Sequence, residues 1–242
     1  MSEVLLAAEG LSAWYGAAQI LFGVNLEVRR GEVVALMGRN GAGKSTTLKA
    51  LMGLVPARAG RVRFLQRDIS KAQPHEVARA GLGWVPEDRR IFGDLTVLEN
   101  LEVGRQAARS FPDGTAAPSW TPEALFKLFP NLGEMPDRPG GRMSGGEQQM
   151  LTVARTLMGN PHLVLLDEPS EGVAPVIVDG MVQMILELKA AGVSILLSEQ
   201  NLHFAALVSD RAYVLEKGQI RWQGTMQELA SDDAVRRAYL SM

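Results

Sequence analysis

The chain contains, directly after a short apolar run, the stretch Gly38-Arg39-Asn40-Gly41-Ala42-Gly43-Lys44-Ser45-Thr46. It fits the pattern G-x-x-x-x-G-K-[ST], whose glycines let successive backbone N–H groups turn toward a triphosphate. Lys44 brings a full positive charge to the β and γ oxygens, and Ser45 offers a hydroxyl to Mg²⁺. The alternative is a glycine-rich turn that only caps a helix, but a chance match in 242 residues is rare. We therefore predict that the whole stretch forms a nucleotide-binding loop.

The segments around this loop follow the order strand, loop, helix. Residues 32–37 are apolar and rich in β-branched types, and residues 44–52 suit a helix. Further apolar runs at 163–166 and 194–197 flank residues 175–191, where apolar side chains recur at helical spacing. Strands that alternate with helices indicate a parallel sheet covered on both faces.

The rest of the chain divides into a β-rich start and a helical insertion. An antiparallel hairpin is expected from residues 4–15 and 20–28. Helical patterns cover residues 98–108, 122–129 and 145–158, and residues 110–119, rich in Pro, Gly, Ala and Thr, read as a surface connection. No internal repeat is visible. We predict one domain over residues 1–242, with a catalytic core and β subdomain at 1–86 and 159–242 and an inserted helical subdomain at 87–158.

Composition limits the class of protein. The chain is 46% hydrophobic with a net charge of −2, its 25 Lys and Arg are balanced by 27 Asp and Glu, and it has no cysteine. These values are typical of a globular protein in a reducing compartment and give no support to nucleic-acid binding. No window reaches the roughly 18 apolar residues of a spanning helix, so any membrane role needs other subunits. The three histidines, His75, His162 and His203, are isolated, and we expect no metal other than Mg²⁺.

Two carboxylates end the apolar run at 163–166, namely Asp167 and Glu168. Ligands bind at the carboxyl ends of strands in open α/β sheets, and adjacent strand residues point to opposite faces. Asp167 is therefore expected to reach the Mg²⁺ shell, and Glu168 to orient or deprotonate the water that attacks the γ-phosphate. A strand that ends in a solvated acidic turn is the alternative.

A second glycine-rich motif opens a predicted helix at Met143-Ser144-Gly145-Gly146-Glu147-Gln148-Gln149. Ser144 and Glu147 have the spacing of a capping box. Capping does not explain the pair Gly145-Gly146, which weakens a helix and suits close approach of backbone to a negative group. The motif predicts a second phosphate site on the same chain.

This motif, with Ser144 placed 23 residues before Asp167, resembles the L-S-G-G-Q signature of the ATP-binding cassette (ABC) ATPases, and the resemblance covers the whole chain. It implies an α/β fold with a P-loop NTPase (RecA-like) core around a parallel sheet, an antiparallel β subdomain and an inserted α-helical subdomain. In that family the signature residues, here Ser144, Gly145, Gly146 and Glu147, act in trans on ATP held by the phosphate loop of a second ATPase. Tyr15 matches the aromatic residue that stacks on adenine, with plain packing as the alternative.

Two positions depart from the common family pattern. Glu87 stands where most members have Gln, and Gln200 where most have the switch His. Gln200 can donate a hydrogen bond to the γ-phosphate but cannot take up a proton near neutral pH, which leaves Glu168 as the general base. Glu87 opens the helical subdomain, so we expect it to couple the nucleotide state to a permease and offer it as a further Mg²⁺ ligand beside Ser45 and Asp167.

Together with the runs at 87–92, 95–101, 143–150 and 167–175, these positions resemble the smaller ATPase of branched-chain amino acid importers. Glu171 also occurs in relatives that handle urea and short amides, so those substrates and other amino acids remain alternatives. The resemblance implies Mg²⁺-dependent ATP hydrolysis, a second ATPase subunit, two transmembrane permeases, an extracytoplasmic substrate-binding protein and a place on the cytoplasmic face of the membrane. A soluble ABC ATPase of cofactor assembly, ribosomes or DNA is the other class considered.

Overall fold

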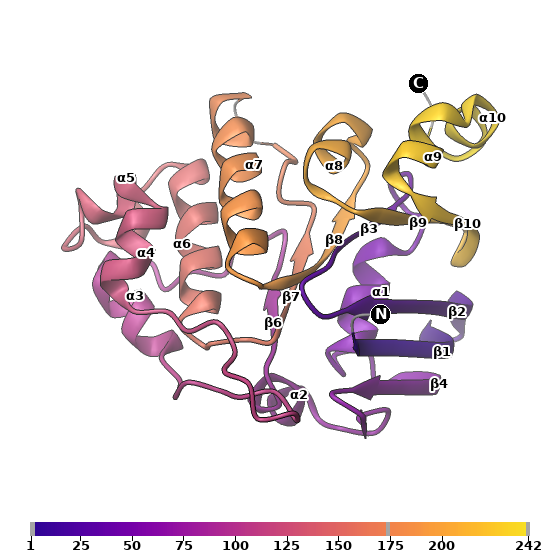
Figure 1. The fold of residues 1–242 in the computed structure, drawn as a ribbon, viewed down its shortest axis with the longest axis horizontal. Coiled ribbons are helices and arrows are strands. Elements are labelled where there is room, and N and C mark those ends of the chain that lie inside the picture. Colours follow the sequence, from indigo (N-terminus) through magenta and orange to yellow (C-terminus); the bar gives the residue numbers. More distant parts are fainter. Residues whose placement is uncertain (1–2, 173–174, 241–242) are drawn as a thin grey trace.

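The computed structural model describes residues 3–172 and 175–240, and its centre is a six-stranded sheet (Figure 1). The strand order is β10-β9-β3-β8-β7-β6, in which β10 alone runs antiparallel to its neighbour. The strands are β3 (Val33–Met37), β6 (Leu82–Val85), β7 (Leu163–Asp167), β8 (Ser194–Glu199), β9 (Arg211–Glu216) and β10 (Gln219–Thr225). Every residue of β3, β7 and β8 is buried, as expected for strands covered on both faces. The predicted parallel sheet is confirmed.

Alternate residues of these strands belong to different cores. Leu163 and Leu165 of β7 pack with α1 (Lys44–Leu51) on one face of the sheet. Val164 and Leu166 pack with α7 (Pro175–Ala190) and α8 (Leu202–Val208) on the other face. Burial of both sets explains why β7 is apolar at every position before Asp167.

The antiparallel sheet has the order β2-β1-β4-β5. Its strands are β1 (Val4–Tyr15), β2 (Ala18–Arg29), β4 (Ala57–Phe64) and β5 (Arg67–Asp68). The predicted hairpin is confirmed as the β1–β2 pair. Alternating residues of β1 pack against the same core as α1, so this sheet covers the helix that follows the phosphate loop (Figure 1).

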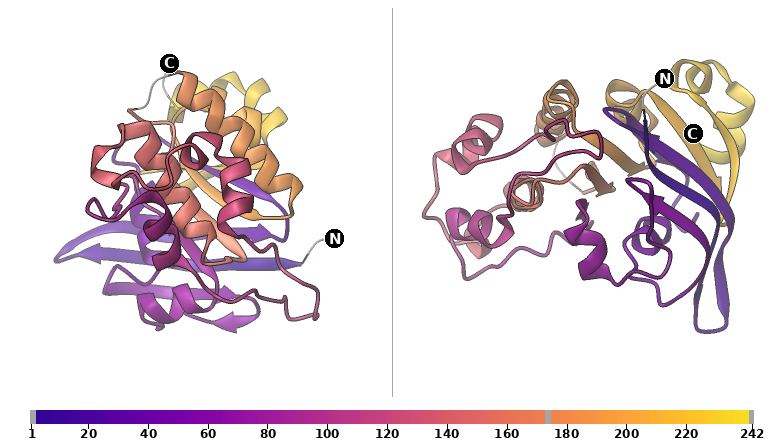
Figure 2. Two further views of the ribbon diagram at one scale, coloured as in Figure 1. Left: turned by 90° about the vertical axis from the view of Figure 1, so that its left-hand side faces the viewer. Right: turned by 60° about the horizontal axis from the view of Figure 1, so that its bottom comes forward.

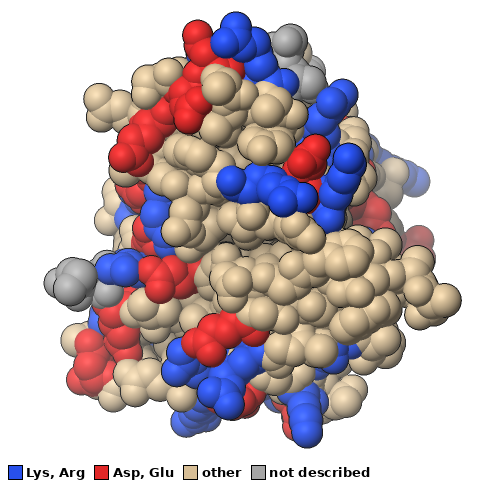
Figure 3. Space-filling view, turned by 90° about the vertical axis from the view of Figure 1, so that its right-hand side faces the viewer, with Lys and Arg blue, Asp and Glu red and all other residues tan. Residues whose placement is uncertain are grey.

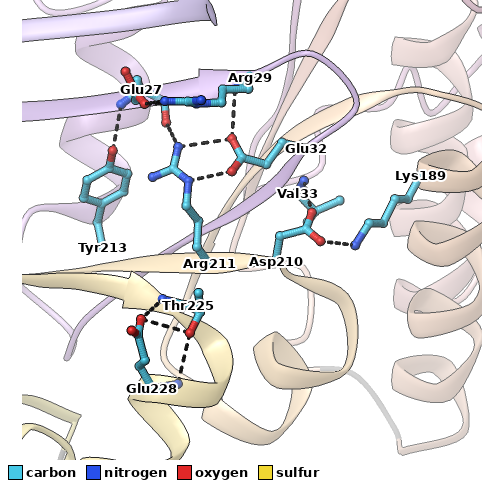
Figure 4. A network of polar contacts seen from close by, with 10 residues as sticks. All are labelled: Glu27, Arg29, Glu32, Val33, Lys189, Asp210, Arg211, Tyr213, Thr225 and Glu228. Atoms are coloured by element: carbon cyan, nitrogen blue, oxygen red, sulfur yellow. Dashed lines mark hydrogen bonds and ion pairs between the residues drawn. The ribbon is translucent and has the colours of Figure 1, made fainter. Parts of the chain in front are cut away.

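A partly buried polar network joins the antiparallel sheet to the central sheet (Figure 4). Arg211 of β9 makes two hydrogen bonds to the Glu32 carboxylate, at 2.5 and 3.1 Å, and a third to the carbonyl oxygen of Glu27 in β2, at 2.6 Å. The Tyr213 hydroxyl accepts a hydrogen bond from Glu27 N–H at 3.0 Å. These charge-assisted bonds fix the two sheets relative to each other.

The helices of the insertion gather at the β6 end of the central sheet (Figure 2). They are α3 (Val97–Gly104), α4 (Pro122–Leu128), α5 (Pro130–Gly133) and α6 (Gly145–Leu157), with a 3₁₀ turn at Gly140–Arg142. The helix predicted for 98–108 ends earlier, at Gly104, where an added Cβ would meet the Arg155 carbonyl oxygen at 2.3 Å. The connection at 110–119 is more packed than its composition suggested, because Phe111 is buried.

Elements that carry no sequence-based expectation complete the fold. They are α2 (Pro74–Arg79), α9 (Met226–Ser231), α10 (Asp233–Val235) and a π-helical turn at Arg236–Leu240. The C-terminal elements pack on β3 and β9 through a small separate core. Within residues 3–172 and 175–240, none of the helices has the length and apolar character required to span a bilayer.

Candidate nucleotide-binding site

The phosphate loop lies between the end of β3 and the start of α1 (Figure 1). Gly43 caps α1 with φ 109°, a left-handed conformation that favours glycine. An added Cβ at Gly38 would stand 2.4 Å from the Leu215 carbonyl oxygen. The Lys44 ammonium folds back into the loop and donates to the carbonyl oxygens of Gly38, at 2.7 Å, and Arg39, at 3.2 Å. The loop is therefore a cradle around a buried lysine.

Lys44 also contacts the end of β7. Its Nζ lies 2.9 Å from Glu168 Oε1, and both side chains are less than a tenth exposed. Glu168 has φ 46° and follows the last strand residue, so strand alternation does not set its direction. Its N–H donates to the carbonyl oxygen and Oγ of Ser198, at 3.1 and 3.2 Å. The expectation that strand alternation orients Glu168 is wrong. A left-handed turn at Glu168 directs its side chain toward Lys44 instead.

Asp167 lies beside Ser45, as its predicted role requires. Its Oδ1 accepts hydrogen bonds from Ser45 Oγ at 2.9 Å and Ser198 Oγ at 2.7 Å. Burial raises the pKa of Asp167 despite these hydrogen bonds. A carboxylate and a hydroxyl are hard oxygen donors of the kind that Mg²⁺ takes along with phosphate oxygens and water. The donor set therefore fits Mg²⁺, although the described residues offer no cluster of three or more His, Asp or Glu that would hold a metal alone.

Glu171 adds a third acidic group close to the lysine. A hydrogen bond with the Glu168 carboxyl, together with burial and the charges of Glu168 and Glu87, raises the pKa of Glu171 to about 7. Burial opposes ionisation of Glu168, but hydrogen bonds to Glu171 and Lys44 outweigh it and lower its pKa. The two carboxyls thus share a proton near neutral pH, with the charge held by Glu168. Residues 173–174, which follow in the same motif, lie outside the described part of the chain.

Gln200 follows β8 in a turn that a buried carboxylate organises. Glu199 is 1% exposed, and it accepts hydrogen bonds from the N–H groups of Ser170, Gln200 and Asn201, each at 3.1 Å. Gln200 and Asn201 line an open groove of about 940 Å³ together with Arg39 and Asn40 of the phosphate loop. The structure therefore brings the switch position and the phosphate loop to one groove.

Tyr15 ends β1 and is 48% exposed. Its hairpin is tied to the phosphate loop through Gly218, whose N–H donates to the Ala42 carbonyl oxygen at 2.8 Å. The carbonyl oxygen of Gly218 accepts from the N–H of Phe22 in β2 at 2.9 Å. Tyr15 therefore lies on a strand pair anchored beside the loop, with its ring available to a ligand.

The signature residues open α6, and the predicted capping box is confirmed. Ser144 Oγ accepts from Glu147 N–H at 3.3 Å, while the Glu147 carboxylate accepts from Ser144 N–H at 2.7 Å. An added Cβ at Gly146 would stand 2.9 Å from Ile177 Cγ1 of α7. In the described part of the chain, no hydrogen bond or ion pair joins these residues to the phosphate loop.

Sequence reasoning missed two residues of the site, Ser198 and Glu199. Both are buried polar residues at the end of a strand whose preceding positions are apolar. Ser198 contacts both Asp167 and Glu168, and Glu199 fixes the turn before Gln200. The signal in the sequence was a pair of polar residues at the end of an apolar strand. The contacts of Ser198 become visible only when β7 is seen to pair with β8.

Comparison with known proteins identifies this arrangement. The family model described as ABC transporter matches residues 21–171. The chain belongs to the ABC transporter family. This cassette is 41% identical over 236 residues to the high-affinity branched-chain amino acid transport ATP-binding protein BraG of Pseudomonas aeruginosa, covering 98% of this chain and 99% of BraG. It is 35% identical to the lipopolysaccharide export ATP-binding protein LptB of Escherichia coli K12, covering 97% and 96%.

Solved structures agree with this assignment. An ABC-transporter ATP-binding cassette crystallised without nucleotide matches with a TM-score of 0.79 at 31% identity, over 96% of this chain and 97% of that one. A cassette in its ADP conformation matches equally well, over 97% of each chain. The resemblance to ABC ATPases and the predicted α/β P-loop fold are confirmed. The protein is an ATP-binding, ATP-hydrolysing subunit of an ABC transporter, a class that works with transmembrane permease components.

Proposed function

We propose that this cassette powers an importer of branched-chain amino acids. The proposal of branched-chain amino acids as the substrate rests on the similarity to BraG over nearly the full length of both chains. Urea, short amides and other amino acids remain alternatives within the same importer group, because Glu171 also occurs in relatives with those substrates. Lipopolysaccharide export is a second candidate, favoured by the 35% identity to LptB over 97% of this chain.

The proposed hydrolysis reaction uses the groups that meet around Lys44. Entry of the γ-phosphate into the loop gives the Lys44 ammonium a new anionic partner, which releases the Glu168 carboxylate 2.9 Å away. Glu168 then accepts a proton from the attacking water. Ser45 and Asp167 would hold Mg²⁺, which neutralises charge on the phosphate oxygens. Glu87 is exposed at the start of the helical subdomain and is proposed as a coupling residue and further Mg²⁺ ligand.

The remaining predicted residues act around this centre. The phosphate-loop backbone from Gly38 to Thr46 would bind the phosphates, Tyr15 would stack on adenine, and Gln200 would position the γ-phosphate from the shared groove. The signature from Ser144 to Glu147 would bind ATP held by a second ATPase, since among the described residues no hydrogen bond or ion pair joins it to the phosphate loop of its own chain. The pair can be two copies or two related chains.

Exposed apolar side chains on the helical subdomain support docking on permeases. Phe92, Leu98 and Val103 are 48%, 37% and 55% exposed. They belong to the segment that begins at Glu87, so motion of this segment on nucleotide binding would reach a docked permease. We propose two permeases, an extracytoplasmic substrate-binding protein and a position on the cytoplasmic face of the membrane. We also propose that residues 87–158 form the helical subdomain, and that residues 1–86 and 159–242 form the catalytic core with the β subdomain.

The balance of charged residues, and their distribution on one face (Figure 3), give no support to the alternative of a nucleic-acid-associated ABC ATPase. On the face that carries the edges of the antiparallel sheet and the C-terminal elements, Lys and Arg lie beside Asp and Glu around a wide uncharged area (Figure 3). A nucleic-acid interface is expected to gather positive charge in a stripe. We therefore propose no nucleic-acid partner.

Purification of the Glu168→Gln form from native membranes with ATP tests this function. The variant should keep ATP bound and hold the assembly together, and mass spectrometry then identifies every chain that co-purifies. Two multi-spanning permeases and a second ATPase are expected, and binding of leucine, isoleucine and valine to the associated extracytoplasmic protein would establish the substrate. Recovery of soluble partners alone would overturn the transporter role. Recovery of an export assembly would replace import by the second candidate.

A further inference from the structure

Arg89 lies against the first turn of the signature helix α6. An added Cβ at Gly145 would stand 2.7 Å from Arg89 Nη1 and 3.3 Å from its Cζ and Nη2. The carbonyl oxygen of Arg89 accepts a hydrogen bond from the buried Thr152 Oγ1 at 2.8 Å, farther along the same helix. The arginine side chain therefore extends toward the N-terminus of α6, and the missing side chain of Gly145 leaves space for its guanidinium.

The backbone holds Arg89 in this place against its conformational preference. Arg89 and Arg90 have φ values of 63° and 52°, so two consecutive non-glycine residues adopt the left-handed region. Such strain persists only where surrounding contacts impose it. Here α6 supplies both contacts, since Arg155 Nη2 donates to the Arg90 carbonyl oxygen at 2.7 Å and Thr152 holds Arg89.

The placement of Arg89 adds positive charge beside a helix N-terminus. A helix N-terminus carries partial positive charge and disfavours a neighbouring cation. Among the described residues, no carboxylate forms an ion pair with Arg89, and none accepts a hydrogen bond from its guanidinium. Two positive elements thus meet at one point beside Ser144, and an anion there would interact favourably with both.

The signature itself gives a reason for an additional cation. Glu147 replaces the Gln of the L-S-G-G-Q pattern and places a carboxylate at the third position of α6. Hydrogen bonds with Ser144 lower the pKa of Glu147, so this group is charged at neutral pH. A carboxylate within an anion-binding site repels phosphate, and a cation that binds the same phosphate offsets that repulsion.

We propose that Arg89 binds the γ-phosphate of ATP held by the phosphate loop of the second ATPase, acting in trans beside the signature and offsetting the charge of Glu147. This inference rests on the proposed function, since it needs two ATPases that pair through signature and phosphate loop. Arg89 is in this account a nucleotide-binding residue whose substrate lies on another subunit. Arg89 thus links the strained segment after Glu87 directly to the ATP site that the signature of one chain and the phosphate loop of another would form together.

Turnover by the purified transporter and ATP affinity of the isolated chain test this role together. Arg89→Met keeps an unbranched side chain of similar reach but removes the charge. It should leave the ATP affinity of the isolated chain within twofold, while kcat of the assembled transporter falls roughly tenfold or more. Glu147→Gln is then added to Arg89→Met, and it keeps the capping box because Gln also caps. The kcat of this double variant should be at least threefold higher than that of Arg89→Met alone. Arg105→Met, just after α3, removes an exposed arginine paired with Glu102, and should change neither quantity.

A kcat within twofold of wild type for Arg89→Met would overturn the inference. The inference would also be overturned by a lower melting temperature of Arg89→Met together with a double variant, Arg89→Met with Glu147→Gln, whose turnover is no higher. That result would show that Arg89 acts through packing alone. Failure of the proposed function is distinguishable, because the wild-type chain would then co-purify with no permease and no second ATPase, before Arg89 is changed.

Discussion

Lys44 of the phosphate loop and Glu168 at the end of β7 form a buried ion pair, with Nζ and Oε1 2.9 Å apart. The pair joins the group proposed to bind the γ-phosphate to the group proposed to activate water. The Lys44 ammonium donates to the carbonyl oxygens of Gly38 and Arg39 and to the Glu168 carboxylate, so all of its donors are in use. A phosphate that enters the loop must therefore replace one of these partners. In the proposed reaction, nucleotide binding and release of the general base are therefore one event.

The buried pair makes a prediction about stability. Lys44→Met leaves the Glu168 carboxylate buried without its cation, which should lower the free energy of unfolding by about 3 kcal/mol. Adding Glu168→Gln removes that uncompensated charge, so the double variant should be more stable than Lys44→Met alone. Urea unfolding of both single variants and the double variant, without nucleotide, measures the coupling. Strictly additive effects would show that the two side chains do not interact.

Ser198 should matter for turnover more than its position in a strand suggests. Ser198→Ala removes the 2.7 Å donor to Asp167 and an acceptor for Glu168 N–H, so both carboxylates lose orientation. We expect turnover to fall about 10- to 100-fold with ATP still bound. Ser194→Ala is the matched control, because Ser194 is equally buried on β8 but, among the described residues, its hydroxyl bonds only to Gly31 N–H. The account is wrong on this point if the two variants lose turnover alike.

Much of the scaffold could be predicted because its signals are local. The buried strands β3 and β7 are short apolar runs, and the phosphate loop and capping box are written in consecutive residues. The direction of Glu168 could not be predicted in the same way, since it depends on a left-handed turn and on Ser198 in a strand about 30 residues away.

Glycine roles and loop packing show the same limit. Sequence reasoning assigned the pair Gly145-Gly146 to close approach of an anion, whereas the structure also places Arg89 against the first and Ile177 against the second. Residues 110–119 look like a polar connection, yet Phe111 is buried beside His162 with ring centroids 4.9 Å apart. Partners that come from distant segments leave no periodic pattern in the sequence.

Gln200 should position the γ-phosphate without taking part in proton transfer. Gln200→Ala is expected to lower turnover about tenfold while ATP affinity is kept, because one hydrogen bond to developing charge is lost. Gln200→His should restore turnover above about pH 7 and add a new acid dependence near the histidine pKa, which wild type lacks. A pH–rate profile of the three forms checks both effects. Unchanged turnover in Gln200→Ala would exclude the positioning role.

His162 should make the fold sensitive to acid. Burial, and then the charges of Arg109 and Arg30, lower the pKa of His162 to about 4. An unfolded chain takes up the proton near pH 6.5, so between about pH 6.5 and 4 the unfolded state binds more protons and stability falls as the pH falls. His162→Phe keeps an aromatic ring against Phe111 and should reduce the loss between pH 7 and 5 by about 1–2 kcal/mol. Equal pH dependence in both proteins would contradict this.

The most direct test of the catalytic account compares ATP turnover and ATP binding by the assembled transporter in its wild-type and Glu168→Gln forms. The substitution keeps the shape of the side chain and removes its basicity and its charge. The account predicts that bound ATP is retained while turnover at saturating ATP falls about a thousandfold or more. Turnover within a few-fold of wild type would contradict the assignment of Glu168 as the general base and, with it, the proposed reaction centre around Lys44.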